Sequence, residues 1–447
     1  MRKSIKNSRL LRMTINSRAR ATAYGLSLLV LPLSAVAELT YRADAGVGRS
    51  DNLYRTATAP IEQDIATVGL DLTWSREQRR LNGELNIDVD YFHYLNSSAA
   101  TTESSEVTGL ADGSLTLAIV PDRFTWFLQD TFGQAQSNPF AASTPANREN
   151  INYFTTGPDF ITRIGSTGSA RLFGRYSDAT YEISPLDATH ESAGVVLAHQ
   201  LALRSQIALN GVVERVDFDD DANVDYERRN YFVSYTAASA RTQVLADVGY
   251  STLEREDDDV TDGALVRISF TREMSVSSDV RLAFGTEITD SSNSLRGVAQ
   301  GPSSAGSIAV VATSEPFESR FAELGWTFQR NRTGMGLGAS LNKDIYEDQR
   351  QLNRTRWVYD ANVSRELTAN VNFMLSGALT NEKFDVSGFE ADELHASATL
   401  SWRLGRNLGV SLMAERFDRD TNTLVGEYTE NRAFLTLFYT YSSVATR

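Results

Sequence analysis

The side chains best suited to acid–base or nucleophilic chemistry are few in this chain of 447 residues. It has no cysteine and four histidines, which are His93, His190, His199 and His395. Ser397 and Ser401 follow His395 on the same face of an expected strand, but same-face neighbours at strand spacing do not make a catalytic triad. No G-x-S-x-G or H-E-x-x-H motif occurs. We therefore expect no enzyme, no cofactor and no thiolate metal site.

Two acidic runs are the other candidates for chemistry. The first is Asp219-Asp220-Asp221 with Asp225, and the second runs from Glu254 to Asp259 and is followed by Asp262. Clustered carboxylates in outer loops can bind Ca²⁺ that bridges to lipopolysaccharide phosphates. The spacing matches no EF-hand loop, however, and we favour the interpretation of both runs as solvated, charged loops.

The bulk composition is that of an acidic globular protein. Lys and Arg total 43 against 57 Asp and Glu, and the mean hydropathy is -0.29. A net charge of -14 argues against nucleic acid as a partner. Taken alone, these values indicate a soluble protein, but the order of the residues contradicts that interpretation.

The first 37 residues resemble a targeting segment. They carry seven basic side chains, no acidic residue before Glu38, a short apolar run from Ala21 to Leu33, and Ala35-Val36-Ala37 at the end. These are the three parts of a secretory signal peptide, cleaved after Ala37. An uncleaved amphipathic helix is the alternative. We expect residues 1–37 to be the signal peptide and 38–447 to be one mature domain with a net charge of -21.

Two-residue alternation of apolar and polar side chains runs through the rest of the chain. Leu81 to Tyr91 is the clearest case, with Leu85, Ile87 and Val89 on one face and Glu84, Asn86 and Asp88 on the other. Twenty such segments can be counted, and no run of 18 apolar residues follows Ala37.

The connections between these segments alternate in length. Those after even-numbered segments are short, and those after odd-numbered ones are mostly long and polar. This is typical of a transmembrane β-barrel with short periplasmic turns and long extracellular loops. The fold class is therefore all-β: a single antiparallel up-and-down barrel of about 18–20 strands. A soluble sandwich or propeller would also alternate, but would not explain the asymmetry of the loops.

Alternation predicts which charged side chains face the lumen. The candidates are Arg42, Asp44, Asp71, Glu84, Asp88, Asp90, Arg171, Arg175, Asp247, Arg267, Arg281, Glu287, Asp344, Arg356, Asp360, Glu393, Arg403 and Glu415. Their acidic excess predicts a mild preference for cations. Of the histidines, only His395 is expected to face inward. Pro158 predicts a local break in a strand, and 290–317 is either a loop that folds into the lumen or a disordered outer loop.

Two stretches resemble a known family. Tyr41 to Arg55 (YRADAGVGRSDNLYR) resembles the opening of β-barrel porins encoded with bacterial exopolysaccharide synthesis and export loci, and Asn147 to Phe160 resembles one of their internal motifs. Asn431 to Tyr441 is similar to the aromatic-ended final strand that the barrel-assembly machinery recognises, although residues 442–447 follow it.

The resemblance implies a channel in the outer membrane of a Gram-negative bacterium that passes a secreted polysaccharide or assists its secretion. Expected partners are outer-membrane lipid, lipopolysaccharide and polysaccharide export components. A general diffusion porin and a non-channel barrel that binds surface components are the alternatives. Nothing in the sequence indicates an oligomeric state.

Overall fold

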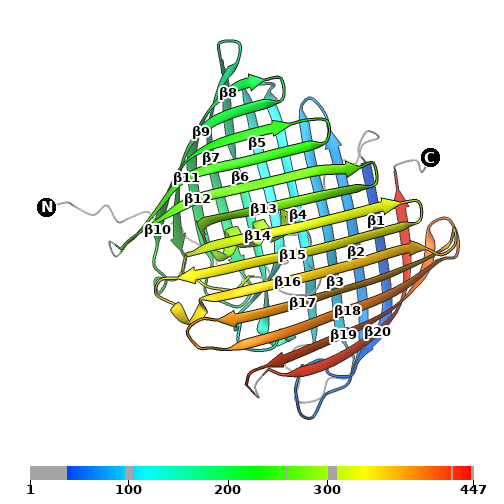
Figure 1. The fold of residues 1–447 in the computed structure, drawn as a ribbon. Coiled ribbons are helices and arrows are strands. Elements are labelled where there is room, and N and C mark those ends of the chain that lie inside the picture. Colours follow the sequence, from blue (N-terminus) through cyan, green and yellow to red (C-terminus); the bar gives the residue numbers. More distant parts are fainter. Residues whose placement is uncertain (1–37, 96–103, 257–258, 301–309, 424–425, 444–447) are drawn as a thin grey trace, which may run out of the picture.

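Twenty antiparallel strands close into a single barrel in the computed structural model (Figure 1). The structure describes residues 38–95, 104–256, 259–300, 310–423 and 426–443, so the predicted signal peptide lies outside the described residues. Each strand pairs with its neighbours in sequence, and β1 pairs with β20 to close the sheet. Closure leaves no free strand edge. The predicted all-β up-and-down barrel is confirmed.

The strands are 12 to 17 residues long. Their bounds are β1 Glu38–Ser50, β2 Gln63–Glu77, β3 Leu81–Tyr94, β4 Ser105–Val120, β5 Phe124–Gln136, β6 Arg148–Ile164, β7 Gly168–Tyr181, β8 Ala188–Ala202, β9 Ser205–Phe218, β10 Tyr226–Ala238, β11 Thr242–Arg255, β12 Val260–Ser275, β13 Ser278–Thr289, β14 Phe317–Arg330, β15 Thr333–Tyr346, β16 Arg354–Glu366, β17 Val371–Phe384, β18 Glu390–Arg403, β19 Leu408–Thr421 and β20 Tyr428–Ser442.

The connections differ between the two ends of the barrel. Turns after even-numbered strands are short, such as 78–80, 203–204 and 331–332. Segments after odd-numbered strands are mostly longer, including 137–147 and 290–316. We call these the short-turn end and the long-loop end. The first residue of β1 and the last residue of β20 both lie at the short-turn end, as an even number of strands requires.

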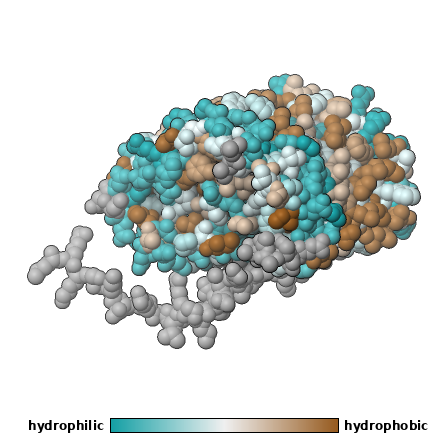
Figure 2. All heavy atoms as spheres, turned by 90° about the horizontal axis from the view of Figure 1, so that it is seen from below, coloured by the Kyte–Doolittle hydropathy of each residue, from teal (hydrophilic) through white to brown (hydrophobic). Residues whose placement is uncertain are grey.

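The outer face of the wall carries exposed apolar side chains on strands all around the barrel. Val47, Val68, Leu172, Leu209, Val248, Leu282, Leu337, Leu379, Leu412 and Leu435 are each exposed by more than 40%. Figure 2 shows hydrophobic side chains gathered over part of the wall, next to a largely hydrophilic end of the molecule. A soluble monomer rarely exposes so much contiguous apolar surface. The wall therefore has the character expected of a surface that contacts lipid.

The ladder between β6 and β7 breaks at the predicted proline. Pairing runs to Thr156 and Tyr176 and resumes at Asp159 and Phe173, leaving out Pro158. A Cβ on Gly157 would lie 2.0 Å from the carbonyl oxygen of Gly174, so the two strands approach too closely there for any other residue. The break predicted from Pro158 is confirmed.

In the part of the chain that the structure describes, helical structure is confined to the long loops. The helix α2 (Ser291–Gln300) follows β13, and the single turns η2 (Pro145–Asn147) and η3 (Arg350–Leu352) precede β6 and β16. Within the described residues, no helix has both the length and the hydropathy needed to span a membrane.

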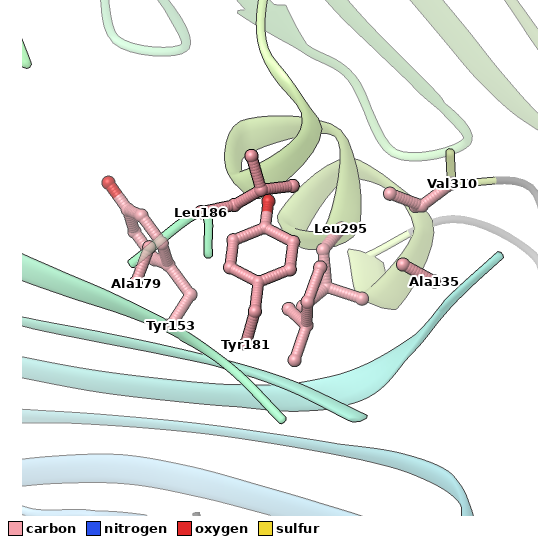
Figure 3. Packing of buried hydrophobic residues seen from close by; sticks show 8 residues of the cluster. Ala135, Tyr153, Ala179, Tyr181, Leu186, Leu295 and Val310 are labelled. Atoms are coloured by element: carbon pink, nitrogen blue, oxygen red, sulfur yellow. The ribbon is translucent and has the colours of Figure 1, made fainter. Parts of the chain in front are cut away.

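Buried apolar residues cluster near the long-loop end rather than along the middle of the barrel. The largest cluster contains Ala135, Ile151, Tyr153, Ala179, Tyr181, Leu186, Leu295 and Val310 (Figure 3). Leu295 belongs to α2 and Val310 to the following segment, while the others lie on β5 to β7 or the loop after β7. The described part of 290–317 therefore folds into the barrel, which agrees with the first of the two alternatives for this segment.

Candidate functional site

The ladder register divides the charged side chains between the two faces of the wall. The inner face is identified by α2, because Arg296 Nη2 donates to Gln129 Oε1 at 3.0 Å and Leu295 packs beside Tyr153. Paired residues share a face, so the register carries this assignment around the barrel. It places all eighteen candidates on the inner face: Arg42, Asp44, Asp71, Glu84, Asp88, Asp90, Arg171, Arg175, Asp247, Arg267, Arg281, Glu287, Asp344, Arg356, Asp360, Glu393, Arg403 and Glu415.

Strands β1 to β3 present an acidic wall to the lumen. Arg42 is the cation among these carboxylates, with Nε 3.7 Å from Asp44 and 3.9 Å from Asp71. Its guanidinium lies over the ring of Phe438 on β20, 4.3 Å from the centroid. Asp88 pairs in register with Asp71, and Asp90 lies two residues further along β3. With Glu84, also on β3, five of the candidate carboxylates among the described residues of this wall face one arginine.

Strands β11 to β16 line a lumen cavity with a volume of about 710 Å³, which we call the larger cavity. Two of its arginines, Arg267 and Arg354, are each paired with two carboxylates. Arg267 lies 3.0 Å from Asp247 and 3.4 Å from Glu287. Such closely matched charges give a polar surface with little net field.

A second cavity of about 640 Å³ is lined by strands β4 to β9 and by α2. We call it the arginine chamber, and the residues that matter most here are Phe127, Asp159, Arg171, Phe173, Arg175 and Arg296. Arg175 Nη2 lies 2.8 Å from Asp159 Oδ2, and Arg171 Nη1 lies 3.6 Å from Asp159 Oδ1. Both guanidiniums lie over Phe173, at 5.2 and 5.1 Å from the ring centroid.

Helix α2 lies between the two cavities, because Asn293 lines both. Asp290 caps the helix by accepting a hydrogen bond from Asn293 N at 2.9 Å. After the helix, the chain adds a short parallel bridge to β5: Gln136 N donates to Val310 O at 2.9 Å and Ala312 N to Gln136 O at 3.0 Å. The segment is therefore fixed to the barrel wall on both sides of 301–309.

The loop 137–147 crosses the long-loop end of the barrel. It joins β5 to β6, yet Phe140 packs 4.5 Å from Phe384 and 5.8 Å from Phe389, on the opposite side of the barrel. Arg419 on β19 donates to Ala141 O at 2.7 Å. Aromatic contacts and hydrogen bonds thus hold this loop across the mouth.

Arg55, in the loop after β1, adds a buried ionic contact to this mouth. Its Nε donates to Glu430 Oε2 at 2.9 Å, and its Nη1 donates to Ser143 O at 2.8 Å. Burial alone would lower the pKa of Arg55, but Tyr428, Glu430 and Glu393 raise it above its ordinary value. The guanidinium therefore stays charged and ties three segments of the mouth together.

His190 corrects one prediction about the histidines. The sequence predicts that among the histidines only His395 faces inward. In the structure His190 lies on β8, is 2% exposed, and points inward with Nδ1 3.2 Å from Glu214. Arg228 also pairs with Glu214 and lies 3.6 Å from Asp290. This buried group connects the barrel wall to the residue that caps α2.

His395 does face the lumen, but no nucleophile accompanies it. Its ring stacks on Phe417 at 4.3 Å and its Nε2 lies 3.4 Å from Glu415. Ser397 instead bonds to Ser376 at 2.6 Å. Nothing in this arrangement resembles a triad.

The first acidic run occupies the loop between β9 and β10. Asp225 Oδ1 accepts a hydrogen bond from Phe218 N at 2.8 Å, and Asp220 Oδ1 accepts one from Ala222 N at 3.0 Å. These carboxylates thus shape the turn. In the part of the chain that the structure describes, no group of three or more His, Asp or Glu side chains is arranged to hold a metal ion.

Several lumen charges were missed from the sequence. Glu214, Arg228 and Arg354 have the inward parity of their strands, so alternation extended to the strand ends would have found them. Arg296 had no such signal, because it reaches the lumen from a helix that alternation does not predict.

Comparison with known proteins gives fold likeness alone. No protein-family model matches the chain, and no curated protein matches it. Among solved structures, the siderophore receptor PirA from Pseudomonas aeruginosa is similar at 9% identity over 90% of this chain and 80% of its own, with a TM-score of 0.43. The FrpB iron transporter from Neisseria meningitidis (9% identity, 90% and 81% covered, TM-score 0.42) and OccAB2 from Acinetobacter baumannii (10%, 91% and 98%, TM-score 0.36) are further examples.

Proposed function

We propose that this protein is a gated channel in the outer membrane of a Gram-negative bacterium. The observation that carries the proposal is a closed barrel with an apolar outer wall and an inner face bearing eighteen predicted charges. Lipid offers no hydrogen bonds to backbone, so a sheet crosses a membrane only when closed. About twenty strands enclose a lumen wide enough for water and solutes.

The closed long-loop end supports gating rather than free diffusion. Helix α2 occupies the lumen between the two cavities, and 137–147 crosses the mouth. These segments are loops held in place by a few side-chain contacts and backbone hydrogen bonds. They are not a separately folded plug domain.

For the cargo, we propose an exopolysaccharide, which the channel passes outward or helps to secrete. The basis is the resemblance of Tyr41 to Arg55 and of Asn147 to Phe160 to porins of exopolysaccharide loci. The same segments have defined places in the structure: the first leads into the loop that carries Arg55, and the second begins at the end of the crossing loop. The resemblance therefore covers parts of the mouth.

Deletion of the gene in its natural host tests this function. Surface polysaccharide should fall in the deletion strain. Expression of the intact chain should restore it, whereas expression of residues 1–37 alone should not. Unchanged surface polysaccharide together with lost uptake of small hydrophilic solutes would contradict the proposal and favour a general diffusion porin.

A further inference from the structure

The arginine chamber carries positive charge that its own carboxylates do not balance. Glu214 is engaged by Arg228 and His190. Asp159 is 7% exposed and makes its shorter contact with Arg175, leaving Arg171 with one ion pair at 3.6 Å. Arg296 bonds to the neutral side chains of Gln129 and Asn293, at 3.0 and 3.4 Å, and forms no ion pair with any described carboxylate.

The chamber also holds buried polar atoms that form no hydrogen bond. Asp159 Oδ1 and Arg296 Nε are buried and accept or donate no hydrogen bond within the described structure. Buried polar atoms in native proteins nearly always have partners, so each such atom calls for one. By contrast, Arg171 has a side chain 46% exposed and is available to a solute in the cavity.

The arginines are held in place rather than left to move. Phe173 lies under both Arg171 and Arg175, and Phe127 lies 4.9 Å from the Arg175 guanidinium. The break in the ladder at Pro158 frees its carbonyl oxygen, which accepts a hydrogen bond from Arg175 Nη1 at 3.0 Å. Irregularities of this kind re-aim side chains at functional sites. The guanidiniums are therefore preorganised for a planar anion.

The size and remaining lining of the chamber indicate what bears that anion. A volume of about 640 Å³ exceeds the needs of an inorganic ion and falls within the range of small-molecule sites. Thr116, Thr125 and Ser192 also line it, whereas the hydroxyls of Thr155 and Ser177 are buried and bond to each other at 3.0 Å. Hydroxyls and arginines together suit a solute that carries several hydroxyls and a carboxylate.

We propose that the arginine chamber binds an acidic saccharide, with its carboxylate on Arg171 and Arg296 and its hydroxyls on the serine and threonine side chains. The inference rests on the proposed function, in which the saccharide is part of the exported polysaccharide. It adds that this polysaccharide is acidic.

Calorimetric titration of the refolded, detergent-solubilised protein tests the proposal without any need for transport. The probes are trigalacturonate, the neutral trisaccharide maltotriose and inorganic phosphate. Trigalacturonate should bind, and the other two should bind at least tenfold more weakly. The double variant Arg171→Gln/Arg296→Gln should weaken trigalacturonate binding by roughly tenfold or more, because it removes the charged hydrogen-bond donors that the carboxylate would contact.

Arg267→Gln is the matched control, since Arg267 is a lumen arginine in the larger cavity with two carboxylate partners. It should leave binding unchanged. Equal binding of maltotriose or phosphate, or equal loss in both variants, would overturn the proposal. Binding in a barrel that conducts no ions would overturn the channel function alone, and conductance without binding would overturn the acidic-saccharide site alone.

Discussion

Leu295→Ala should release α2 from the barrel wall. Leu295 is 2% exposed and packs with Ile151, Tyr153 and Tyr181 (Figure 3). Truncation of a buried leucine to alanine costs about 2–5 kcal/mol. When α2 is undocked, residue 295 is exposed to solvent whether it is leucine or alanine. The substitution therefore destabilises the docked state alone. At the low end, about 2 kcal/mol lowers the ratio of docked to undocked helix roughly 30-fold.

The assay is single-channel recording in planar lipid bilayers. Leu295→Ala should raise the fraction of time spent in the open state at least tenfold over the unsubstituted protein. Leu337→Ala is the control, because the Leu337 side chain is on the outer face of β15 and is 54% exposed. A folded Leu295→Ala barrel with an unchanged open fraction would refute the inference that α2 obstructs the lumen.

Three further predictions concern the mouth, the charge of the lumen and the N-terminus. Arg55→Ala removes one of the two guanidiniums that pair with buried Glu430, leaving Arg432, and should cost about 1.5–3 kcal/mol for the lost charged hydrogen bonds, seen as a lower temperature of the heat-induced gel shift. Arg49→Ala, which breaks ion pairs exposed to solvent, should shift that temperature much less, and equal shifts would contradict the role of Arg55. Reversal potentials in a salt gradient should indicate a mild cation preference, and an anion preference would contradict the acidic wall. N-terminal sequencing of the mature protein should begin at Glu38, and a retained Met1 would contradict cleavage after Ala37.

The strands could be predicted from the sequence because their pattern is local. A wall with an apolar environment outside and water inside imposes a period of two on every strand, and segments such as Leu81 to Tyr91 display it directly. The same period assigns lumen faces. It fails where strand ends are uncertain by a residue or two, which is why His190 was misplaced although it lies only two residues after β8 begins.

The closure of the mouth could not be predicted in this way. Phe140 meets Phe384 across the barrel, and such a contact leaves no periodic trace in either segment. Helix α2 is short, and its Asp290 cap is a weak signal without the wall that Leu295 packs against. The arginine chamber combines both problems, because strand parity finds Arg171 and Arg175 whereas Arg296 arrives from the helix.

Conductance of the intact chain beside a variant lacking residues 296–312 tests the channel most directly. Both proteins are refolded, checked for barrel closure by the gel shift, and inserted into planar bilayers. We predict discrete current steps in both, with larger steps or longer openings in the deletion variant. Folded, inserted barrels that carry no current in either form would contradict a channel and favour a barrel with a structural or surface-binding role.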